Sequence, residues 1–595
     1  MRRSLCWLVA LCLLATALPA LSVLPALPAL AEGAGAHAIE TRTMDFYYYD
    51  PDTSMPVEVH FIDGSDVPYL ALSDWPAVMR GMVEADADNA AIPIPAFSMA
   101  GSVGTLTREE DGYAVEFDCD ADTIHFLDYD AYMRIPGDTF IIDMLDGIST
   151  VDEDGSVRYF ARQADSYQRY GREVTIDAGA YGIDFIAQGG DCYVPMQTLS
   201  DLLMSYNYSN IYCNGEFAVV AGLKAFGDYD NGPTPLGELY YSVQPHDRSE
   251  SMAKFTYGEL CLALDALYGL KDNHDIATFA GMIGDTGLET DLTGTDPVAA
   301  DGALYQLLNL HLDDIHTRMY LPSPASGFDA GRDFGDIYGK GYSRTASGTQ
   351  ISVYGDARDA AFPGGVPHYQ EIGDTAWITF DHFTGIPDGV DYYKTPLSVA
   401  TEAEVNELDT MSLLIYAYAQ ITRQDSPIEN VVMDLSNNLG GDSQAAVFAI
   451  AAFLGVCSIS TKDALTGALV TGNYAIDINL DGRADEGDRL LTKKNLFCLE
   501  SPVSFSCGNL APCAFKASNA VTLLGRTSAG GACIVHPLST ADGSSFRISG
   551  PLQLSFLKNG AFYDIDRGAE PDFPLMKPAS FYDREGLTEL IEGIR

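Results

Sequence analysis

Two segments of the sequence place a hydroxyl and several glycine amides where a short apolar strand ends and a helix begins. The first follows the apolar run 430–435 and contains Gly440 and Gly441, and the second contains Ser506 directly before the helix-like run that starts at Cys507. Glycine lets the backbone approach a substrate carbonyl closely, and amides at a helix start point outward. The pattern predicts a serine nucleophile, Ser506, and an oxyanion hole formed by the amides of Gly440, Gly441 and Cys507.

Each of these features also has a plainer structural interpretation. A serine directly in front of a helix is typical of an N-cap, in which the hydroxyl satisfies backbone amides. A Gly-Gly pair after a strand is typical of a tight turn. Neither motif establishes an active site by itself, so the wider sequence context decides between the interpretations.

Four blocks in order along the chain resemble the C-terminal processing peptidase superfamily, which also contains the tricorn core proteases and interphotoreceptor retinoid-binding protein. The resemblance covers residues 240–595 and places Ser506 at the position of the nucleophile. It implies a serine peptidase with a crotonase-like core. The blocks are Asp434-Leu435 through Asn438 to Gly440-Gly441, then Ser504-Phe505-Ser506, then residues 524–531, and finally Gly568-Ala569-Glu570-Pro571-Asp572.

The resemblance also implies a base and an acidic partner. The segment 312–317 resembles the Asp-x-x-His segment of the family, so His316 is the predicted base. Tail-specific members carry a lysine base twenty-five residues after the nucleophile, where this chain has Gly531. The tricorn-like arrangement of serine, histidine and an acidic residue is therefore favoured, with Asp566 near the position of the family's glutamate. Two further histidines, His311 and His536, are weaker alternatives for the base.

A second chemical signal lies in the loop from Asp477 to Asp488. Oxygen-bearing side chains occupy positions 1, 3, 5, 9 and 12 of this loop, and Gly482 stands at position 6. This is the spacing of an EF-hand-type loop, in which position 7 contributes a backbone carbonyl. The spacing predicts a structural Ca²⁺ ion, and the alternative is an acidic surface turn. The predicted ligands are Asp477, Asn479, Asp481, Arg483 through its carbonyl, Asp485 and Asp488.

Composition and charge limit the classes of protein. The 595 residues are 47% hydrophobic and 11% aromatic, which indicates a globular chain of about two to four domains. The formal net charge of −50 disfavours nucleic acids and anionic membrane surfaces as partners. No organic cofactor is predicted, and a peptide or protein is the expected substrate.

The N-terminus is typical of an export signal. Arg2-Arg3 precede an apolar run from Leu5 to Leu21, and Ala29-Leu30-Ala31 resembles a cleavage site. Residues 1–31 are therefore predicted to be a signal peptide, and no later stretch is long and apolar enough to span a membrane. The mature protein is expected to be secreted or on the cell surface.

Nine cysteines follow the predicted cleavage site, without a Cys-x-x-Cys motif. This scatter argues against a metal cluster. Cys192 and Cys213 could form a disulfide within one small domain, and buried free thiols are the expected state of most of the others.

Periodicity divides the rest of the chain into three predicted domains. Residues 38–228 hold two copies of a strand-strand-helix unit, since Val59-His60-Phe61-Ile62 and Tyr69-Leu70-Ala71-Leu72 recur as 183–186 and 193–196. The unit resembles the N-terminal modules of copper amine oxidase-like and bacterial wall proteins, which implies a binding or spacer domain with a cell-wall or surface component as a candidate ligand. Residues 236–330 are predicted to form a helical subdomain.

Residues 331–595 alternate strands and helices, which predicts an α/β catalytic core. Too few residues separate this core from the helical subdomain to hold a PDZ module, so none is expected. The sequence thus predicts an exported serine-type peptidase that uses Ser506, His316 and Asp566. The alternative is a non-catalytic cell-surface binding protein on the same fold. Esterase activity is a third hypothesis because the acyl chemistry is shared.

Overall fold

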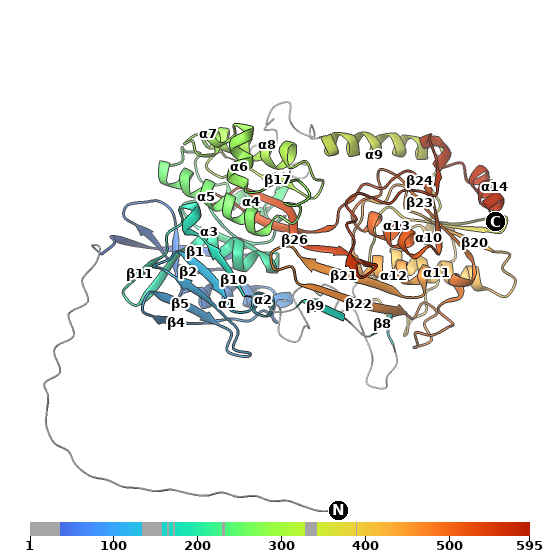
Figure 1. Cartoon of the computed structure of the whole chain (residues 1–595), viewed down its shortest axis with the longest axis horizontal. Helices are drawn as coiled ribbons and strands as arrows, with labels where there is room; N and C mark the ends of the chain where they lie inside the picture. The colour runs from blue at the N-terminus through green and yellow to red at the C-terminus, as the bar shows by residue number, and fades with distance from the viewer. Residues whose placement is uncertain are drawn as a thin grey trace, which may run out of the picture. The chain divides into compact units, whose positions relative to one another are not determined.

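The computed structural model describes residues 36–133, 157–163, 166–169, 173–228, 232–327, 342–387 and 389–594 (Figure 1). The chain divides into two units, Met1–His37 and Ala38–Arg595, and the fold below is that of the second. The predicted signal peptide, residues 1–31, lies outside the described residues. Within those ranges, no helix combines the length and apolar character that a membrane crossing requires.

A seven-stranded sheet contains both copies of the predicted repeat. In the first copy, β2 (Ser54–Ile62) and β3 (Tyr69–Ala71) precede α1 (Trp75–Ala85). In the second, β11 (Ile186–Gln188) and β12 (Asp191–Pro195) precede a short helix. The strands β3 and β12 pair antiparallel, so the two copies join through their second strands. The order is β11-β12-β3-β2-β1-β14-β13, with β1 at Ile39–Tyr48, β13 at Asn210–Cys213 and β14 at Ala218–Ala221.

A five-stranded antiparallel sheet, β10-β7-β6-β5-β4, lies in the same part of the chain. Cys119 follows its strand β6, and the Cys119 Sγ lies 2.8 Å from the Cys192 Sγ in β12. All nine described cysteines are free thiols. The predicted Cys192–Cys213 disulfide is therefore wrong, because Cys192 contacts a residue of the other sheet. The strands are β4 (Ala96–Ala100), β5 (Val103–Thr107), β6 (Ala114–Asp118), β7 (Thr123–Phe126) and β10 (Val174–Asp177).

Five helices, α4 to α8, fall within the described part of the segment that was predicted to be helical. Side-chain N-caps start four of its helices: Thr234, Ser249, Thr278 and Asp296 each accept a hydrogen bond from an amide of the first turn. A π-helical stretch, η6 (Leu307–His311), then leads towards His316. The helices are α4 (Pro235–Tyr240), α5 (Glu250–Leu267), α6 (Phe279–Thr286), α7 (Glu289–Leu292) and α8 (Pro297–Gln306).

A six-stranded sheet forms the centre of the C-terminal part. Its order is β18-β19-β20-β23-β24-β29, and all neighbours after β18 are parallel. Parallel strands are covered on both faces, which explains their nearly continuous apolar sequences. The strands are β18 (Tyr369–Ile372), β19 (Thr375–Thr379), β20 (Asn430–Asp434), β23 (Asn495–Glu500), β24 (Val521–Gly525) and β29 (Phe573–Pro574).

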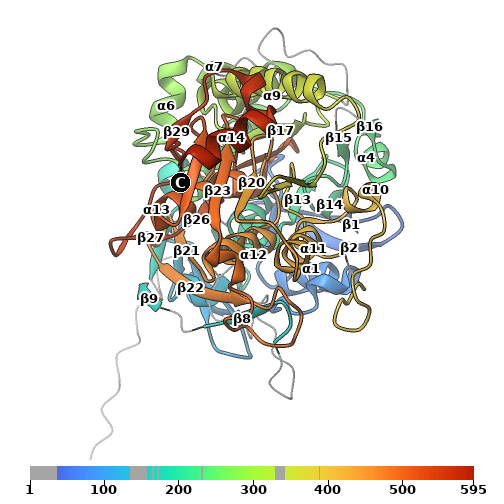
Figure 2. The ribbon, with the colours of Figure 1, turned by 90° about the vertical axis from the view of Figure 1, so that its right-hand side faces the viewer.

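Helices cover both faces of this sheet (Figure 2). Val431 and Met433 of β20 pack in one cluster with α11 (Thr410–Thr422), α12 (Ser443–Leu454) and α13 (Cys507–Ser518). The intervening Val432 points to the other face, into a cluster with α9 and α14. The three layers confirm a mixed α/β class. The covering helices of the second face are α9 (Tyr342–Ala361) and α14 (Arg584–Ile594).

A further sheet connects early and late parts of the chain. Its order is β17-β26-β21-β22-β8, with β25 beside β26 and β9 beside β22. The strands β8 (Phe160–Arg162) and β9 (Ser166–Arg169) thus pair with β22 (Leu469–Ile476) of the C-terminal part. The domain bounds 38–228, 236–330 and 331–595 stay predictions. The remaining strands are β17 (Arg318–Leu321), β21 (Cys457–Asp463), β25 (Cys533–Ser539) and β26 (Ser545–Ser555).

Candidate active site

Ser506 has a strained backbone at the start of α13. Its φ of 57° and ψ of −125° lie in a region that residues with a side chain rarely adopt. The Ser506 amide donates to the carbonyl of Gly530 at 2.9 Å, which helps to hold this conformation. The hydroxyl makes no capping hydrogen bond to the helix. The N-cap interpretation is therefore wrong for this conformation, and the half-buried hydroxyl is left available for other chemistry.

Ser504 has a structural role. Its buried Oγ donates to the Leu435 carbonyl at 2.7 Å and accepts from the Ser501 amide at 2.9 Å. These bonds attach the nucleophile loop to the end of β20. Of the two serines in the Ser-Phe-Ser block, only Ser506 lacks such fixed partners within the described chain.

The Gly440-Gly441 loop lies directly against Ser506. A Cβ added to Gly440 would come within 2.6 Å of the Ser506 Cβ, and the Gly440 φ is 99°, so glycine is required for this approach. The Gly440 amide donates to Asn438 Oδ1 at 2.9 Å and is thus engaged. The amides of Gly441 and Cys507 have no acceptor within the described ranges. The oxyanion donors that this geometry offers are therefore Gly441 and Cys507.

A cavity of about 340 Å³ brings the predicted residues together. Ser506, His316, Gly441 and Cys507 all line it, together with apolar side chains such as Leu510. No hydrogen bond joins the Ser506 hydroxyl to His316 in the described structure. The cavity therefore places a nucleophile, a base and two amide donors around one space, in a conformation that still has to tighten for proton transfer.

His316 is buried, with 7% of its surface exposed. Its ring packs against Phe505 at 4.7 Å between centroids, and its Nδ1 has no hydrogen-bond partner. The His316 carbonyl accepts from Arg547 Nε at 2.7 Å, which fixes the backbone. Burial lowers the pKa of His316 to about 4, against an opposing effect of the Asp314 charge. The imidazole is therefore neutral near pH 7, which is the form that accepts a proton.

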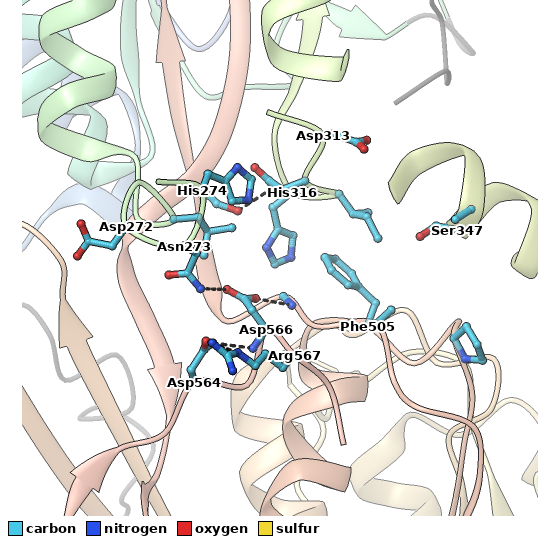
Figure 3. Close-up of a pocket in the computed structure, with 18 of the residues that line it drawn as sticks. Asp272, Asn273, His274, Asp313, His316, Ser347, Phe505, Asp564, Asp566 and Arg567 are labelled. Atoms are coloured by element: carbon cyan, nitrogen blue, oxygen red, sulfur yellow. Dashed lines mark hydrogen bonds and ion pairs between the residues drawn. The ribbon is translucent and has the colours of Figure 1, made fainter. Parts of the chain in front are cut away.

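Asp566 contacts the backbone of the Gly-rich turn (Figure 3). Its Oδ1 accepts from the amides of Gly531 and Ala532, both at 2.8 Å, and its Oδ2 accepts from Asn273 at 3.5 Å. Burial raises the pKa of Asp566. No bond from Asp566 reaches His316 among the described residues. Its predicted role as partner of the base stays a prediction, and its observed contacts position the turn beside the nucleophile.

Asp314 is the acidic residue whose charge acts on His316. Its Oδ2 accepts from the Tyr268 hydroxyl and its Oδ1 from the Ser549 hydroxyl, each at 2.8 Å. Sequence reasoning missed this residue, although it stands two positions before His316 in the Asp-x-x-His segment. The closeness of Asp314 to His316 in the sequence could have identified it as the acidic partner.

The alternative histidines lie elsewhere. His536 Nε2 is 2.8 Å from the Ser205 hydroxyl, its ring packs on Tyr206, and burial lowers its pKa to about 3. His311 is exposed at the end of η6. Neither residue lines the cavity that holds Ser506. Of these three histidines, His316 alone shares a space with the nucleophile.

The predicted calcium loop uses its carboxylates to hold its own backbone. Asp477 accepts from the amides of Asp481 and Gly482, at 3.1 and 2.7 Å, and Asp488 accepts from the amide of Asp485 at 2.8 Å. Burial, with a contribution from neighbouring carboxylates, raises the pKa of both Asp477 and Asp488. Across the described ranges, no three His, Cys, Asp or Glu side chains are grouped to hold a metal ion. The loop has the turn of a calcium site without the gathered ligands, and calcium binding stays a prediction.

The fold and the site define a mixed α/β protein with a strained serine facing a buried histidine. Residues 404–575 match the family described as Peptidase family S41. This segment contains β20, α12, α13, the Gly440-Gly441 loop, Ser506 and Asp566. The resemblance inferred from the sequence blocks is thus confirmed by this match over residues 404–575.

Several solved structures resemble parts of the chain. The photosystem II D1 C-terminal processing protease is 18% identical, with a TM-score of 0.26 over 36% of this chain and 46% of its own length. Mature CPAF complexed with lactacystin is 11% identical, with a TM-score of 0.35 over 58% of this chain and 98% of the CPAF chain. A lipoprotein from Streptococcus agalactiae is 14% identical, with a TM-score of 0.32 over 59% of this chain and 98% of the lipoprotein chain.

The chain thus spans less than half of the length of the processing protease. At these TM-scores the structural likeness is partial, so the candidate site is inferred from the residues of this chain alone. Comparison with curated protein sequences found no match.

Proposed function

We propose that this protein is a serine peptidase in which Ser506 attacks the peptide carbonyl and His316 is the general base. One observation carries the proposal: an uncapped serine with a φ of 57° shares a cavity with a buried histidine and two amides that lack acceptors. Strained backbone of this kind is concentrated at functional sites. The match of residues 404–575 to peptidase family S41 supports hydrolysis of peptide bonds.

The chemistry follows from the arrangement of the groups. Neutral His316 accepts the proton of the Ser506 hydroxyl while the oxygen bonds to the carbonyl carbon. The amides of Gly441 and Cys507 donate hydrogen bonds to the oxyanion that develops. His316 then gives its proton to the leaving amine, and water hydrolyses the acyl-enzyme by the reverse sequence. The Asp314 charge stabilises the imidazolium in between.

The proposal also includes the type of core, the absence of a PDZ module, and export. The parallel sheet with helices on both faces supports a crotonase-like core. The short interval between β17 and β18, in which the described residues form the helix α9, supports the absence of a PDZ module. We also propose export through the signal in residues 1–31, which places the enzyme outside the cytoplasm or on the cell surface. The repeat of residues 38–228 then serves as a binding or spacer module.

Calcium is a further part of the proposal. Asp477 and Asp488 are buried, and burial raises the pKa of both carboxyl groups. The Asp488 charge adds to the rise for Asp477, and the Asp481 charge adds to the rise for Asp488, so a bound cation would relieve both effects. A bound ion would be held by Asp477, Asn479, Asp481, Asp485, Asp488 and the Arg483 carbonyl, and would supply structural rigidity. The side chains must turn from the loop amides towards one centre for this to occur.

Two observations favour the non-catalytic alternative. The described structure has no Ser506–His316 hydrogen bond, and Gly531 stands where tail-specific members carry their lysine. A binding protein on the same fold would show these features permanently, whereas an enzyme would form the hydrogen bond when substrate closes the site.

An active-site-directed fluorophosphonate separates the two functions. The wild-type protein should be labelled on Ser506, as located by peptide mass spectrometry, and Ser506→Ala should lose the label with its melting temperature kept. Ser458→Ala, an exposed serine of β21, is the matched control and should react like the wild type. Absence of labelling in the folded wild-type protein would support the binding protein instead.

A further inference from the structure

A second and larger cavity adjoins the site. It measures about 760 Å³, and it shares His316 and Gly531 with the cavity that holds Ser506. The two cavities therefore adjoin at the predicted base. Phe505 and Ala529, which stand next to the nucleophile and to the Gly530-Gly531 turn, also line the larger cavity. A peptide whose carbonyl reaches Ser506 would extend past His316 into this space.

The lining of the larger cavity is strongly acidic (Figure 3). Six aspartates contribute to it, against Arg567 as the one lysine or arginine among its described lining residues. We call this space the acidic cleft. Its aspartates are Asp272, Asp275, Asp313, Asp314, Asp564 and Asp566.

The single arginine does little to neutralise the cleft. Arg567 is 88% exposed and pairs with Asp564, 44% exposed, at 3.6 Å between Nε and Oδ2. Exposed pairs of this kind are weak because water screens them. Asp272 and Asp275 project from an exposed turn after α5. Asp566 accepts hydrogen bonds from uncharged amides only, so its bonds cancel none of the negative charge.

His316 provides an independent sign that the cleft is built for a ligand. Only 7% of the surface of His316 is exposed, and its Nδ1 has no hydrogen-bond partner among the described residues. A buried polar atom in this state costs free energy unless a ligand or water completes it. The ring faces the space between the loop of Asp313 and the turn of Asp566 (Figure 3).

We propose that the acidic cleft binds a lysine or arginine side chain of the peptide whose carbonyl is attacked by Ser506, so that the substrate class is basic peptides. This inference rests on the proposed peptidase function. A flexible ammonium or guanidinium group fits carboxylates that are spread over a wide cleft. A metal ion needs its ligands gathered, and the described residues offer no such group of three.

Binding can be measured without turnover. Fluorescence anisotropy of the Ser506→Ala protein should be followed with two peptides that carry no other charge and differ in one residue, which is arginine in one and its neutral analogue citrulline in the other. The arginine should be moved along the peptide to find the position that matters. At that position, arginine should bind at least about fivefold more tightly than citrulline, as expected for several partly screened charge pairs.

The net charge of −50 requires a matched control, because it attracts any cation. Asp272→Asn with Asp275→Asn removes two of the six aspartates and should lower the arginine-to-citrulline affinity ratio. Glu589→Gln with Glu592→Gln removes the same charge from exposed positions of α14, which lines neither cavity, and should keep the ratio. Equal loss of preference in both double variants would overturn the inference, because the attraction would then be unspecific.

The outcomes separate this inference from the proposed function. Fluorophosphonate labelling of wild type without an arginine preference at any position would overturn the basic substrate class and keep the peptidase. An arginine preference in Ser506→Ala without labelling of wild type would keep the acidic cleft as a basic-peptide site and overturn catalysis. If both hold, kcat/KM should favour arginine over citrulline peptides by the same factor.

A separate observation concerns the thiols of Cys119 and Cys192. Their sulfurs are 2.8 Å apart, and they connect the end of β6 in the five-stranded sheet with β12 in the seven-stranded sheet. Cys119 is partly exposed, so a small disulfide can reach it, whereas Cys192 is buried beside it. We infer that this pair is a disulfide-forming site that links the two sheets.

Oxidised glutathione supplies the chemistry with balanced atoms and electrons. The Cys119 thiolate attacks one glutathione sulfur and releases reduced glutathione, and Cys192 then displaces the second glutathione to form the Cys119–Cys192 bond. After treatment and denaturing alkylation, peptide mapping should recover this linked pair, and the melting temperature should rise. The control Cys213→Ser should form the same link. Recovery of Cys119 and Cys192 as alkylated thiols would overturn the assignment.

Discussion

The pH dependence of nucleophile activation tests whether a buried histidine is the base. His316 must be neutral to accept the Ser506 proton, and burial lowers its pKa from the ordinary value of a histidine, about 6.5, to about 4. The second-order rate of fluorophosphonate labelling should therefore rise with pH through about 4 and be flat near neutrality. Asp314→Asn should move the midpoint lower still, because the Asp314 charge raises the pKa of His316.

The same shift predicts a change in stability. The folded-state pKa of His316 lies below the unfolded value, so the unfolded chain binds the proton more readily. The stabilising contribution is therefore present above pH 6.5 and is lost as the pH falls through about 4. At about 1.4 kcal/mol per pKa unit, the free energy of unfolding should fall by about 3 kcal/mol. Urea unfolding of wild type and His316→Gln should differ in pH dependence by this amount.

Two results would refute this reasoning. A labelling midpoint at pH about 6 to 7 would mean that the base is not desolvated, and a rate that still rises at pH about 9 would mean a lysine base. His536→Gln is the matched control, since His536 is also buried with a pKa lowered to about 3 but lines neither cavity. It should alter stability and leave the labelling midpoint unchanged.

Three further predictions follow from the geometry. Gly440→Ala places a Cβ 2.6 Å from that of Ser506 and should slow labelling about a hundredfold, whereas Gly364→Ala, with open space around it, should not. Calcium at about 10 mM should raise the free energy of unfolding by about 1.4 kcal/mol if its Kd is about 1 mM. The prediction would be contradicted by equal free energies of unfolding in calcium and in chelator, for both the wild type and Asp481→Ala. A chain that starts at Leu236 is predicted from the sequence to fold, but it leaves β22 without β8 and β9, so its melting temperature should fall; an equal melting temperature would refute this dependence.

Local patterns in the sequence predicted the elements of the core well. The alternation of strands and helices predicted for residues 331–595 includes α11, α12 and α13, because the apolar periodicity and start signals of these helices are local properties. The approach of the Gly440 loop to Ser506 was also predictable, since the family resemblance places both segments around one active site. These features require no knowledge of distant contacts.

Contacts between distant segments could not be predicted in this way. The Gly440 amide, a candidate oxyanion donor, donates its hydrogen bond to the Asn438 side chain instead. Asp566, the candidate partner of the base, accepts from the Gly531 amide. The partner of Cys192 proved to be Cys119, in a different sheet. Such pairings depend on how whole sheets pack, and one sequence carries no signal for the choice among similar partners.

The pairing of β8 and β9 with β22 has a consequence for how the chain folds. Phe160 lies opposite Ile476, so more than 300 residues must be synthesised before β8 meets its partner. At about 5 to 20 residues per second, this takes roughly 15 to 60 s. The early strands remain with open edges during that time, and non-local pairing of this kind slows folding. The sheet therefore closes late, and a holdase that covers residues 157–169 should raise the yield of native protein.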